Sequence, residues 1–587
     1  MNTLVFVRRF LSDYIRNPVN LLLLAVIPTV FVVVAGGSLA KSANVLGGSG
    51  GPAVQTATAG WAAAFLAGVA MYFQTAATRD TDRRVVLAGL PAARLTLARL
   101  LTGGCLALLA STAALIALGL RTGIDDPLRA ITGTVMFAAI YVAVGAVVGS
   151  VTASPVNGTV IVLFVWITDV FFGPAMGAAD RIATRVLPGH YVTLWMVDVP
   201  SGHGSRVGVL AWALTETVAA VAAAWAVSAV RIRNVRRRAP RRNAGSALDQ
   251  TAASWRTAWR DARRNPTLWV LLVVVPVTFI LGAYAVTPNK PVTFFLNEGG
   301  RRFAGTFAMP RVHGATMAPT AIAALSALVG LFTVFDSHDG DRRAVLAGLR
   351  PTALLTARLG VLALATLGVT SVSLATTALV FDATSWATYA AANMLIALTY
   401  GLVGALLGPV VGRVGGVFLA FLIPFLDTVI VQSPLLNPEP TTLSRFLPGY
   451  GGFRVLLDGG LTPGFDTLGP LLIGLAWLVA LAVTVVVSYR RTTVPAAHLP
   501  ARMSPSDAAH PGGGSPPAAA YQSATLVGAG PIVGSSPALS GLLGLGRGKR
   551  LIHRPAFPRP GPERRGAVTS PQLQARKREG SGPGSRT

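Results

Sequence analysis

TLWVLLVVVPVTFILGAYAV, residues 267–286, is a stretch of sequence without a single charged side chain. A helix of about 20 residues reaches about 30 Å, which is the thickness of the hydrocarbon core of a membrane. Lipid offers no hydrogen-bond partner to an exposed backbone amide, so an apolar stretch of this length crosses it as a helix. The stretch therefore predicts a transmembrane helix.

The rest of the chain repeats this pattern. Of its 587 residues, 52% are hydrophobic and only 12% are charged, whereas soluble domains are about 25% charged. This composition predicts an all-α polytopic membrane protein with about 12 transmembrane helices, in two groups of six. The predicted spans are 19–37, 57–78, 95–120, 128–151, 156–176 and 208–230, followed by 267–286, 315–335, 354–379, 387–411, 415–433 and 469–489.

Basic residues predict the orientation. The chain has 50 Lys and Arg against 23 Asp and Glu, and most of the arginines precede or follow spans on a single face. The positive-inside rule makes that face cytoplasmic, so both termini are expected in the cytoplasm of a multi-pass protein. Because topology explains the basic excess, no nucleic-acid partner is expected. The single cysteine, Cys105, excludes an intrachain disulfide.

The two groups of spans resemble each other in sequence. Polar residues before the first span recur before the seventh at an offset of 248, and the loop after the second span recurs after the eighth at an offset of 259. We therefore predict two parallel six-helix halves that form a pseudo-dimer with a pathway at their interface. The predicted parts are a first half at 1–237, a basic cytoplasmic linker at 238–250, a second half at 251–491 and a disordered Pro/Gly/Ser-rich basic tail at 492–587.

The segment before each half's first span is amphipathic. Aromatic residues lie on one side and charged residues on the other, and an Asn-Pro pair follows. Such a segment is expected to lie in the membrane interface, in contact with lipid. Its candidate residues are Arg8, Asp13 and Arg16 in the first half and Arg256, Asp261 and Arg264 in the second.

The loop between the second and third spans of each half joins acidic and basic residues to a short apolar patch. This pattern suits a small helix that docks on a soluble partner; the alternative is a merely solvated membrane flank. The candidate residues are Asp80, Asp82, Arg83, Arg84, Leu87 and Leu90, and in the second half Asp339, Asp341, Arg342, Arg343, Leu346 and Leu349.

Two carboxylates lie within predicted spans. Asp169 and Asp427 align at an offset of 258. A carboxylate inside a membrane is costly and usually faces a cavity or a partner. They could line the outer end of a substrate pathway. Alternatively, they could cap a break or lie at the outer interface beside a short re-entrant helix, and the sequence leaves both interpretations open.

Together these motifs resemble the type-2 ABC exporter permeases, a family that includes bacterial antibiotic and drug efflux systems. The resemblance rests on Arg-Asn-Pro before the first span, Pro28 within it, the acidic-basic loop that leads into Leu-Ala-Gly-Leu-Pro, and Leu-Pro-Gly before the sixth span. The family's usual loop reads Glu-Arg-Gly-Thr, whereas this chain has Asp-x-Asp-Arg-Arg. The resemblance covers about 1–491. It implies a fused pair of permease subunits in a bacterial plasma membrane, whose loops Asp80–Leu90 and Asp339–Leu349 contact an ATPase.

The resemblance also implies partners. ATP and magnesium would be bound by a separate ABC ATP-binding subunit, in two copies, and the cargo would be an amphipathic or hydrophobic small molecule, moved outward. The chain itself lacks the Gly-x4-Gly-Lys-Ser/Thr loop that cradles phosphates. We find no catalytic constellation and no metal-ligand spacing in the sequence, so no catalytic residue, metal or bound cofactor is expected. The alternative is an ion-coupled drug transporter of the major-facilitator type.

Overall fold

The chain forms a bundle of long helices. The computed structural model describes residues 3–16, 18–48, 51–152, 154–176, 181–198, 206–233, 265–346 and 349–493, together with 255–256, 259–260 and 263. Within these residues, eleven helices are long and apolar enough to cross a membrane. This confirms an all-α polytopic membrane protein. The linker at 238–250 and the tail from 494 onward lie outside the described residues.

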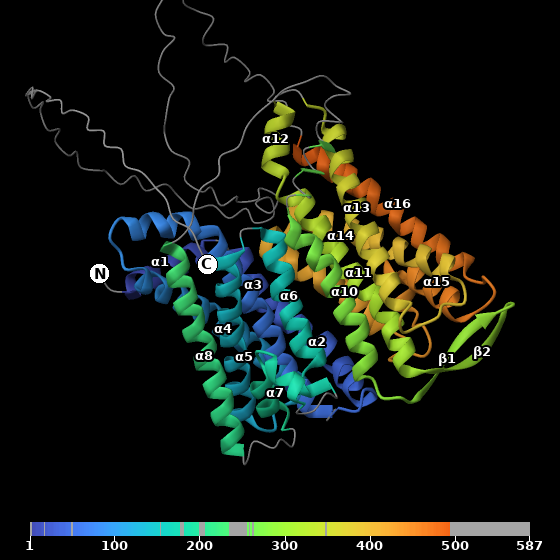
Figure 1. The fold of residues 1–587 in the computed structure, drawn as a ribbon, viewed down its shortest axis with the longest axis horizontal. Coiled ribbons are helices and arrows are strands. Elements are labelled where there is room, and N and C mark those ends of the chain that lie inside the picture. The colour runs from blue at the N-terminus through green and yellow to red at the C-terminus, as the bar shows by residue number, and fades with distance from the viewer. Residues whose placement is uncertain are drawn as a thin grey trace, which may run out of the picture. The chain divides into compact units, whose positions relative to one another are not determined.

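The first set of elements occupies the N-terminal part of the chain, blue through teal to the green helix α8 in Figure 1. Six of its helices are candidate spans, and α1 and α7 are shorter. The helices are α1 (Thr3–Ile15), α2 (Pro18–Val45), α3 (Gly51–Leu87), α4 (Ala92–Thr122), α5 (Pro127–Val151), α6 (Pro155–Phe172), α7 (His190–Val197) and α8 (Arg206–Arg233), with short 3-10 turns at Pro174–Met176 and Ile182–Val186.

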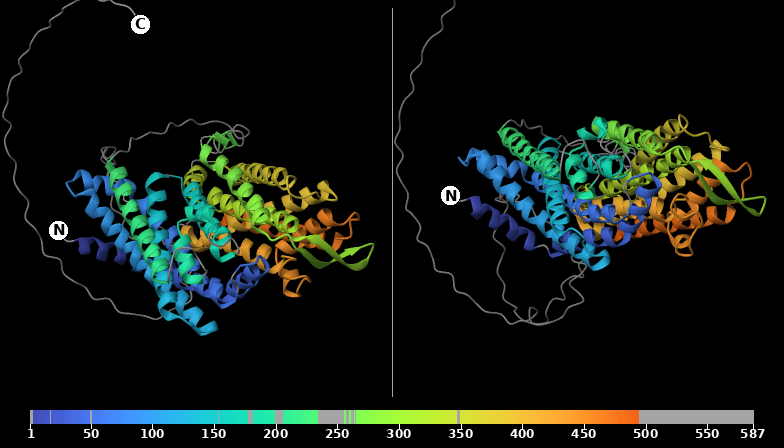
Figure 2. Two further views of the ribbon diagram at one scale, coloured as in Figure 1. Left: turned by 60° about the horizontal axis from the view of Figure 1, so that its bottom comes forward. Right: turned by 90° about the horizontal axis from the view of Figure 1, so that it is seen from below.

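The second set, green to red in Figure 1, follows a similar order but adds a hairpin of two strands. Its elements are α10 (Pro266–Val286), β1 (Pro291–Glu298), β2 (Arg301–Ala308), α11 (Met309–Phe335), α12 (His338–Leu346), α13 (Pro351–Thr377), α14 (Trp386–Pro424), the π-helix η3 (Phe425–Val431), the turn Leu443–Phe446, α15 (Gly449–Leu461) and α16 (Leu468–Thr493). Figure 2 shows the two sets side by side from further directions.

Three spans begin with a polar cap followed by proline. The side chains of Asp126, Ser154 and Asn265 each accept a hydrogen bond from the backbone amide three residues later. The proline that follows each cap occupies the first helical position, where a missing amide hydrogen costs nothing and its φ suits a helix. The Asn-Pro pair before the seventh span therefore starts α10, and no helix runs through it.

Glycines let the central helices of each set approach closely. Helix α3 packs on α5, and α11 packs on α14. A Cβ at Gly145 would overlap the carbonyl of Gly68, and a Cβ at Gly404 would overlap the carbonyl of Ala327. Without side chains at these positions, the two backbones come into direct contact.

The two sets meet through aromatic side chains. Phe65 of α3 lies 5.3 Å from Phe418 and 5.7 Å from Phe421 of α14, measured between ring centroids. Phe31 of α2 stacks on Phe425 at 6.3 Å. Nearer one end of the bundle, Asn265 Nδ2 donates to Asn157 Oδ1 over 3.0 Å. The boundary between the sets is therefore a packed core.

The predicted spans at 387–411 and 415–433 follow each other without a loop. The element Trp386–Val431 consists of two helices joined at a kink, and its 46 residues are too many for a single crossing. The backbone departs from helical geometry inside it at Gly412, where φ is 72°. Glycine adopts this conformation without steric cost, so the chain bends there without a loop. The corresponding spans of the first set, α5 and α6, are separate helices.

The hairpin is a departure from an all-helical chain. Strands β1 and β2 pair antiparallel from Pro291 with Ala308 to Glu298 with Arg301. Gly299 and Gly300 form the turn, both with positive φ. A two-residue turn with positive φ at both positions matches the twist of the strands, which explains the glycine pair.

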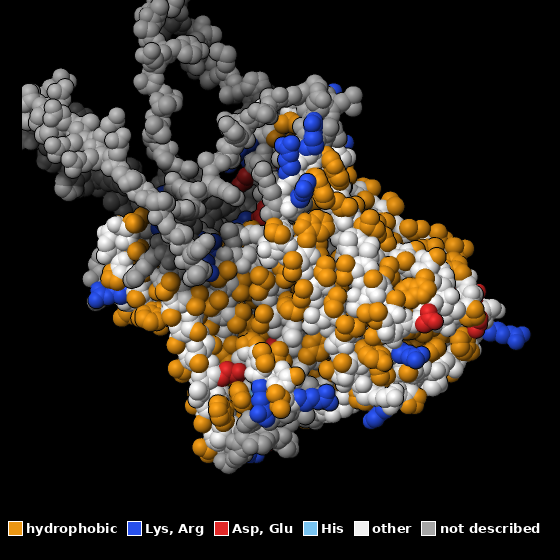
Figure 3. Space-filling model, viewed as in Figure 1, with side chains coloured by type: hydrophobic (Ala, Val, Ile, Leu, Met, Phe, Trp, Pro, Cys, Tyr) orange, Lys and Arg blue, Asp and Glu red, His pale blue; other side chains and the backbone are white. Residues whose placement is uncertain are grey.

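The surface is consistent with a lipid-facing protein. In Figure 3, hydrophobic side chains cover the face between the two ends of the helices. Lys and Arg side chains gather near α12, at one end of α11, and also near the hairpin at its other end. A wide apolar band with charges at its two edges is the pattern expected for helices that cross a bilayer.

Candidate functional site

The first predicted docking segment continues the helix of a span. Helix α3 has 37 residues, so it extends about 55 Å, well beyond the hydrocarbon core. Near its end, Asp82 is buried and pairs with Arg99 of α4, with 2.7 Å between Oδ1 and Nη2 and 3.2 Å between Oδ2 and Nε. Asp80 is exposed, and Leu87 is 77% exposed. The segment is thus tied to the bundle by one carboxylate and presents the rest of its face to solvent.

The second predicted docking segment is the separate short helix α12. Asp341 is buried and pairs with Arg358 of α13, with 2.9 Å between Oδ1 and Nη2. Its other oxygen accepts a hydrogen bond from the hydroxyl of Tyr489 over 2.8 Å. Asp339 is exposed, and Leu346 is 67% exposed. The same division between an anchored and an exposed carboxylate recurs.

Helix geometry explains this division. Successive residues of a helix are rotated by about 100°, so two side chains that are two positions apart point to nearly opposite sides. Asp80 and Asp82 therefore separate into an outer and an inner carboxylate, as Asp339 and Asp341 do. We call the outward faces the docking faces. They consist of Asp80, Arg84 and Leu87 in the first set and Asp339, Arg342, Arg343 and Leu346 in the second, all exposed.

The remaining predicted residues of these loops are less exposed. Arg83, Leu90 and Leu349 are half-buried. Positive φ at Gly89 turns the chain between α3 and α4. Residues 347–348 lie outside the described part of the chain, so the corresponding turn of the second set is not described.

Both docking faces lie at the same end of the bundle. The guanidinium of Arg413 lies 5.9 Å from the ring of Phe73 in α3 and 5.5 Å from the ring of Phe335 in α11. It also pairs with Asp336 over 2.7 Å. Phe73 lies about two turns of helix before Asp80, and Phe335 lies about one turn before Asp339, so both docking faces begin close to Arg413. One partner protein or a pair of copies could therefore contact both faces.

The first predicted interfacial helix, α1, packs on α4, the helix whose Arg99 pairs with Asp82. Val7 of α1 is buried, and the ring of Phe10 lies 3.7 Å from the guanidinium carbon of Arg99. Burial raises the pKa of Tyr14 to about 12. The predicted charged residues Arg8, Asp13 and Arg16 are exposed, and Arg16 lies 3.8 Å from Asp13. In the second set, Arg256 is exposed, while Asp261 and Arg264 lie outside the described residues.

The two membrane carboxylates lie in matching pockets of hydrogen bonds. Asp169 accepts a hydrogen bond from the hydroxyl of Tyr141 over 3.0 Å. Asp427 accepts hydrogen bonds from the hydroxyl of Tyr400 and, over 2.7 Å, from the backbone amide of Gly449, where α15 begins. Both are almost fully buried. The contact of Asp427 with the start of α15 fits the second interpretation, a carboxylate beside a short helix, and both interpretations stay predictions.

Several functional contacts were not among the predicted site residues. Arg99 and Arg358 pair with the inner carboxylates, and Tyr141 and Tyr400 donate to the membrane carboxylates. A signal for them existed in the sequence, because each pair keeps the offset of 259 within otherwise apolar spans. Tyr489 gave no such signal, since Val230 stands at the matching position of the first set.

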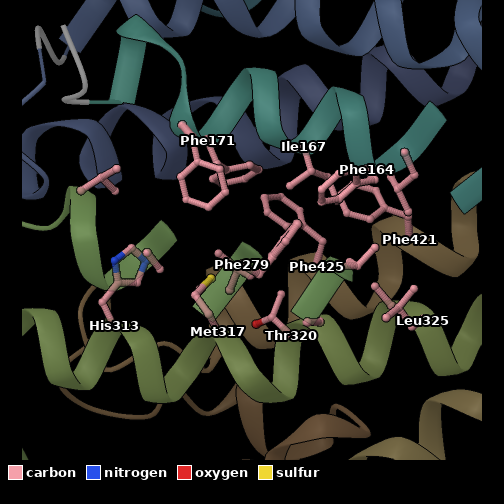
Figure 4. A pocket seen from close by; sticks show the side chains of 18 of the residues that line it. Phe164, Ile167, Phe171, Phe279, His313, Met317, Thr320, Leu325, Phe421 and Phe425 are labelled. Carbon is pink, nitrogen blue, oxygen red and sulfur yellow. The ribbon is translucent and has the colours of Figure 1, made fainter. Parts of the chain in front are cut away.

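An apolar pocket opens between the two sets. Its wall includes chain neighbours of Asp169 and Asp427, such as Ile167 and Phe425, but not the two carboxylates themselves. About 720 Å³ lies between its wall residues, a figure that includes the gaps between side chains and the open solvent at its mouth. Figure 4 shows Phe164, Ile167 and Phe171 of α6 opposite residues of α10 and α11. The pocket reaches from the middle of the bundle toward the end that is opposite the docking faces. Its wall also includes Phe279, His313, Met317, Thr320, Ala324, Phe421 and Phe425.

Residues 53–284 match a family model described as ABC-2 family transporter protein. The matched region begins in α3 and ends in α10, so it contains the first docking face and all the spans from α3 to α8. None of the curated proteins compared with the chain matches it. The match supports a membrane permease of the ABC-2 type, a transport component, for this part of the chain.

Proposed function

We propose that this chain is the membrane-spanning part of an ATP-driven exporter that moves an amphipathic or hydrophobic small molecule out of a bacterial cell. Both six-helix sets would come from one chain, as two fused permease halves with cytoplasmic termini. ATP and magnesium would be bound by two copies of a separate ATP-binding subunit. The family match supports the permease role, and the finer statements are our inference from the arrangement of the site.

The observation that carries this proposal is the pair of docking faces at one end of the bundle. Each is linked to the next span by a bidentate ion pair, Asp82 with Arg99 and Asp341 with Arg358. A force applied to either face would therefore reach α4 or α13 directly. An ATPase dimer that closes on ATP would push both faces together and shift the two sets relative to each other.

The docking faces can be tested by removing their arginines. In the variant Arg83→Ala/Arg84→Ala/Arg342→Ala/Arg343→Ala, we expect ATP hydrolysis by the complex with the ATP-binding subunit to fall about tenfold, equal to about 1.4 kcal/mol of coupling. The arginines orient a charged partner but do not pack in the core, so membrane insertion should be unchanged. The measurement is phosphate release in reconstituted vesicles, with co-purification of the subunit as the second readout.

Arg301 and Arg311 provide the matched control, because both are exposed and lie near the hairpin, at the other end of α11. The variant Arg301→Ala/Arg311→Ala should keep normal hydrolysis. Equal hydrolysis in both variants would remove the docking assignment. Transport that runs on a proton gradient with no ATP-binding subunit present would contradict the whole proposal and favour a secondary transporter.

A further inference from the structure

Among the described residues, the place that corresponds to the apolar pocket on the other side of the boundary is occupied by buried aromatic side chains. The offsets of the repeat give each wall residue a partner in the other half of the chain: Ala324 of α11 corresponds to Phe65 of α3, and Thr320 corresponds to Trp61. Where the pocket has small side chains, the matching place thus has two large aromatic ones. This difference between the halves decides which side is open.

The matching place is filled by its aromatic residues. Phe65 is 1% exposed and Trp61 is fully buried. The ring of Phe65 lies 5.0 Å from that of Trp166 and 5.3 Å from that of Phe418, so it occupies the centre of the boundary. Close-packed side chains leave no room for a ligand there. The pocket exists on the other side because Ala324 does not reach across.

The chemistry of the wall is almost wholly apolar. Among the described residues that line the pocket there is no Asp, Glu, Lys or Arg. An ionised ligand would lose its hydration on entering and find no opposite charge, at a cost of several kcal/mol. The aromatic side chains offer flat apolar contact from α6, α10 and η3. An uncharged and mainly apolar ligand fits this wall.

One polar group of the wall, the imidazole of His313, has its hydrogen-bond donor and acceptor assigned by its neighbours. The hydroxyl of Thr287 donates to the carbonyl of Ala283 over 2.5 Å, so its proton is already used. Nδ1 of His313 lies 2.7 Å from the same hydroxyl oxygen and must therefore be the donor in that contact. A neutral imidazole that donates from Nδ1 has a lone pair on Nε2. His313 is half-buried and lines the pocket, so it can accept a hydrogen bond there.

We propose that the protein binds the molecule it transports in this one pocket, and that this molecule is an uncharged, mainly apolar compound with a hydrogen-bond donor. The inference rests on the proposed function only in stating that the bound molecule is transported. The binding itself does not depend on the proposed function. The donor would meet Nε2 of His313, while the apolar body would lie between α6 and α11. The second half of the chain thereby supplies most of the recognition.

The test uses a matched pair of fluorescent probes and the purified full chain in detergent. 1-Pyrenemethanol is uncharged and carries a donor, its methyl ether lacks the donor, and pyrenebutyrate is an anion. We expect 1-pyrenemethanol to bind about three- to tenfold more tightly than its ether, the range given by one net hydrogen bond. His313→Phe should remove this preference. Pyrenebutyrate should bind most weakly.

The decisive variant introduces into the second half the residue that stands at the matching position of the first half. Ala324→Phe places a ring where Phe65 stands in the first half, and we expect at least a tenfold loss of 1-pyrenemethanol affinity. Ala363→Phe is the control, because Ala363 is exposed on α13. If Ala324→Phe lowers the unfolding temperature, Met317→Trp fills the pocket from another wall position and replaces it. Unchanged affinity in the pocket-filling variant, or tightest binding of the anion, would overturn the inference.

These outcomes are separable from the proposed function. Probe binding needs no ATP-binding subunit, so it can succeed even if hydrolysis never responds to the chain. Conversely, the arginine variants at the docking faces address only coupling. A chain that couples to the ATPase but binds every probe equally would keep the proposed function and lose the pocket assignment.

Discussion

Asp341→Ala is expected to destabilise the protein by about 2–3 kcal/mol. The substitution leaves the guanidinium of Arg358 without its anion, and because the side chain of Arg358 is 23% exposed, water replaces part of the lost interaction and the cost stays below that of a fully buried pair. It also removes the hydrogen bond from Tyr489, which joins α12 to the end of α16. The measurement is the unfolding midpoint of purified protein in detergent, together with the ATP hydrolysis of the complex.

Asp339 offers a closely matched control in the same helix. It lies two residues away but on the exposed side, so Asp339→Ala should change stability by no more than about 0.5 kcal/mol. The same contrast applies to Asp82→Ala and Asp80→Ala in α3. If both members of a pair proved equally harmless, the inner carboxylates would not anchor the docking faces. Asp341→Asn should be intermediate, because the amide oxygen still accepts from Tyr489 while the negative charge is lost.

Gly404→Leu is expected to abolish accumulation of folded protein. Even a Cβ at this position would overlap the backbone carbonyl of Ala327, and no rotamer can relieve a clash with backbone. Helices α11 and α14 would have to separate along the central contact of the second set. Overpacking a core costs about 1–3 kcal/mol when side chains can move, and more when they cannot. Size-exclusion chromatography of the detergent extract measures the folded fraction.

Gly104 is the control for this substitution. It also lies within a transmembrane helix, but nothing surrounds the position where its Cβ would stand. Gly104→Leu should therefore yield a normal monodisperse peak, and its better helix propensity can only help α4. A monodisperse Gly404→Leu protein with the normal unfolding midpoint would show that α11 and α14 do not pack as described.

The hairpin could have been predicted. Residues 291–308 have two runs rich in Thr and Phe around the pair Gly299-Gly300, which is a signature of a tight two-residue turn between strands. The prediction of an all-α protein left no place for it. The kink inside α14 is different. The sequence predicts two spans here, and the backbone adds that they meet at Gly412 without a loop between them.

The pocket could not have been predicted. Ala324 and Thr320 read as ordinary residues of an apolar span, and their importance depends on what faces them from α6. The sequence repeat aligns Ala324 with Phe65, but it does not say that both positions point to the boundary. The place of Asp169 and Asp427 was likewise undecided, because a polar residue in a span has several possible partners.

The sequence by itself determined that this chain crosses the membrane many times, because apolar length and the need to satisfy every backbone amide leave only helices. It also determined the internal repeat and the paired acidic-basic segments, since these are local patterns along the chain. The tertiary structure alone decided which carboxylate of each pair is buried, which glycines touch backbone, and which side of the boundary is open. Those outcomes depend on contacts between residues far apart in sequence, where a single ring at position 65 fills a space that a methyl group at position 324 leaves empty.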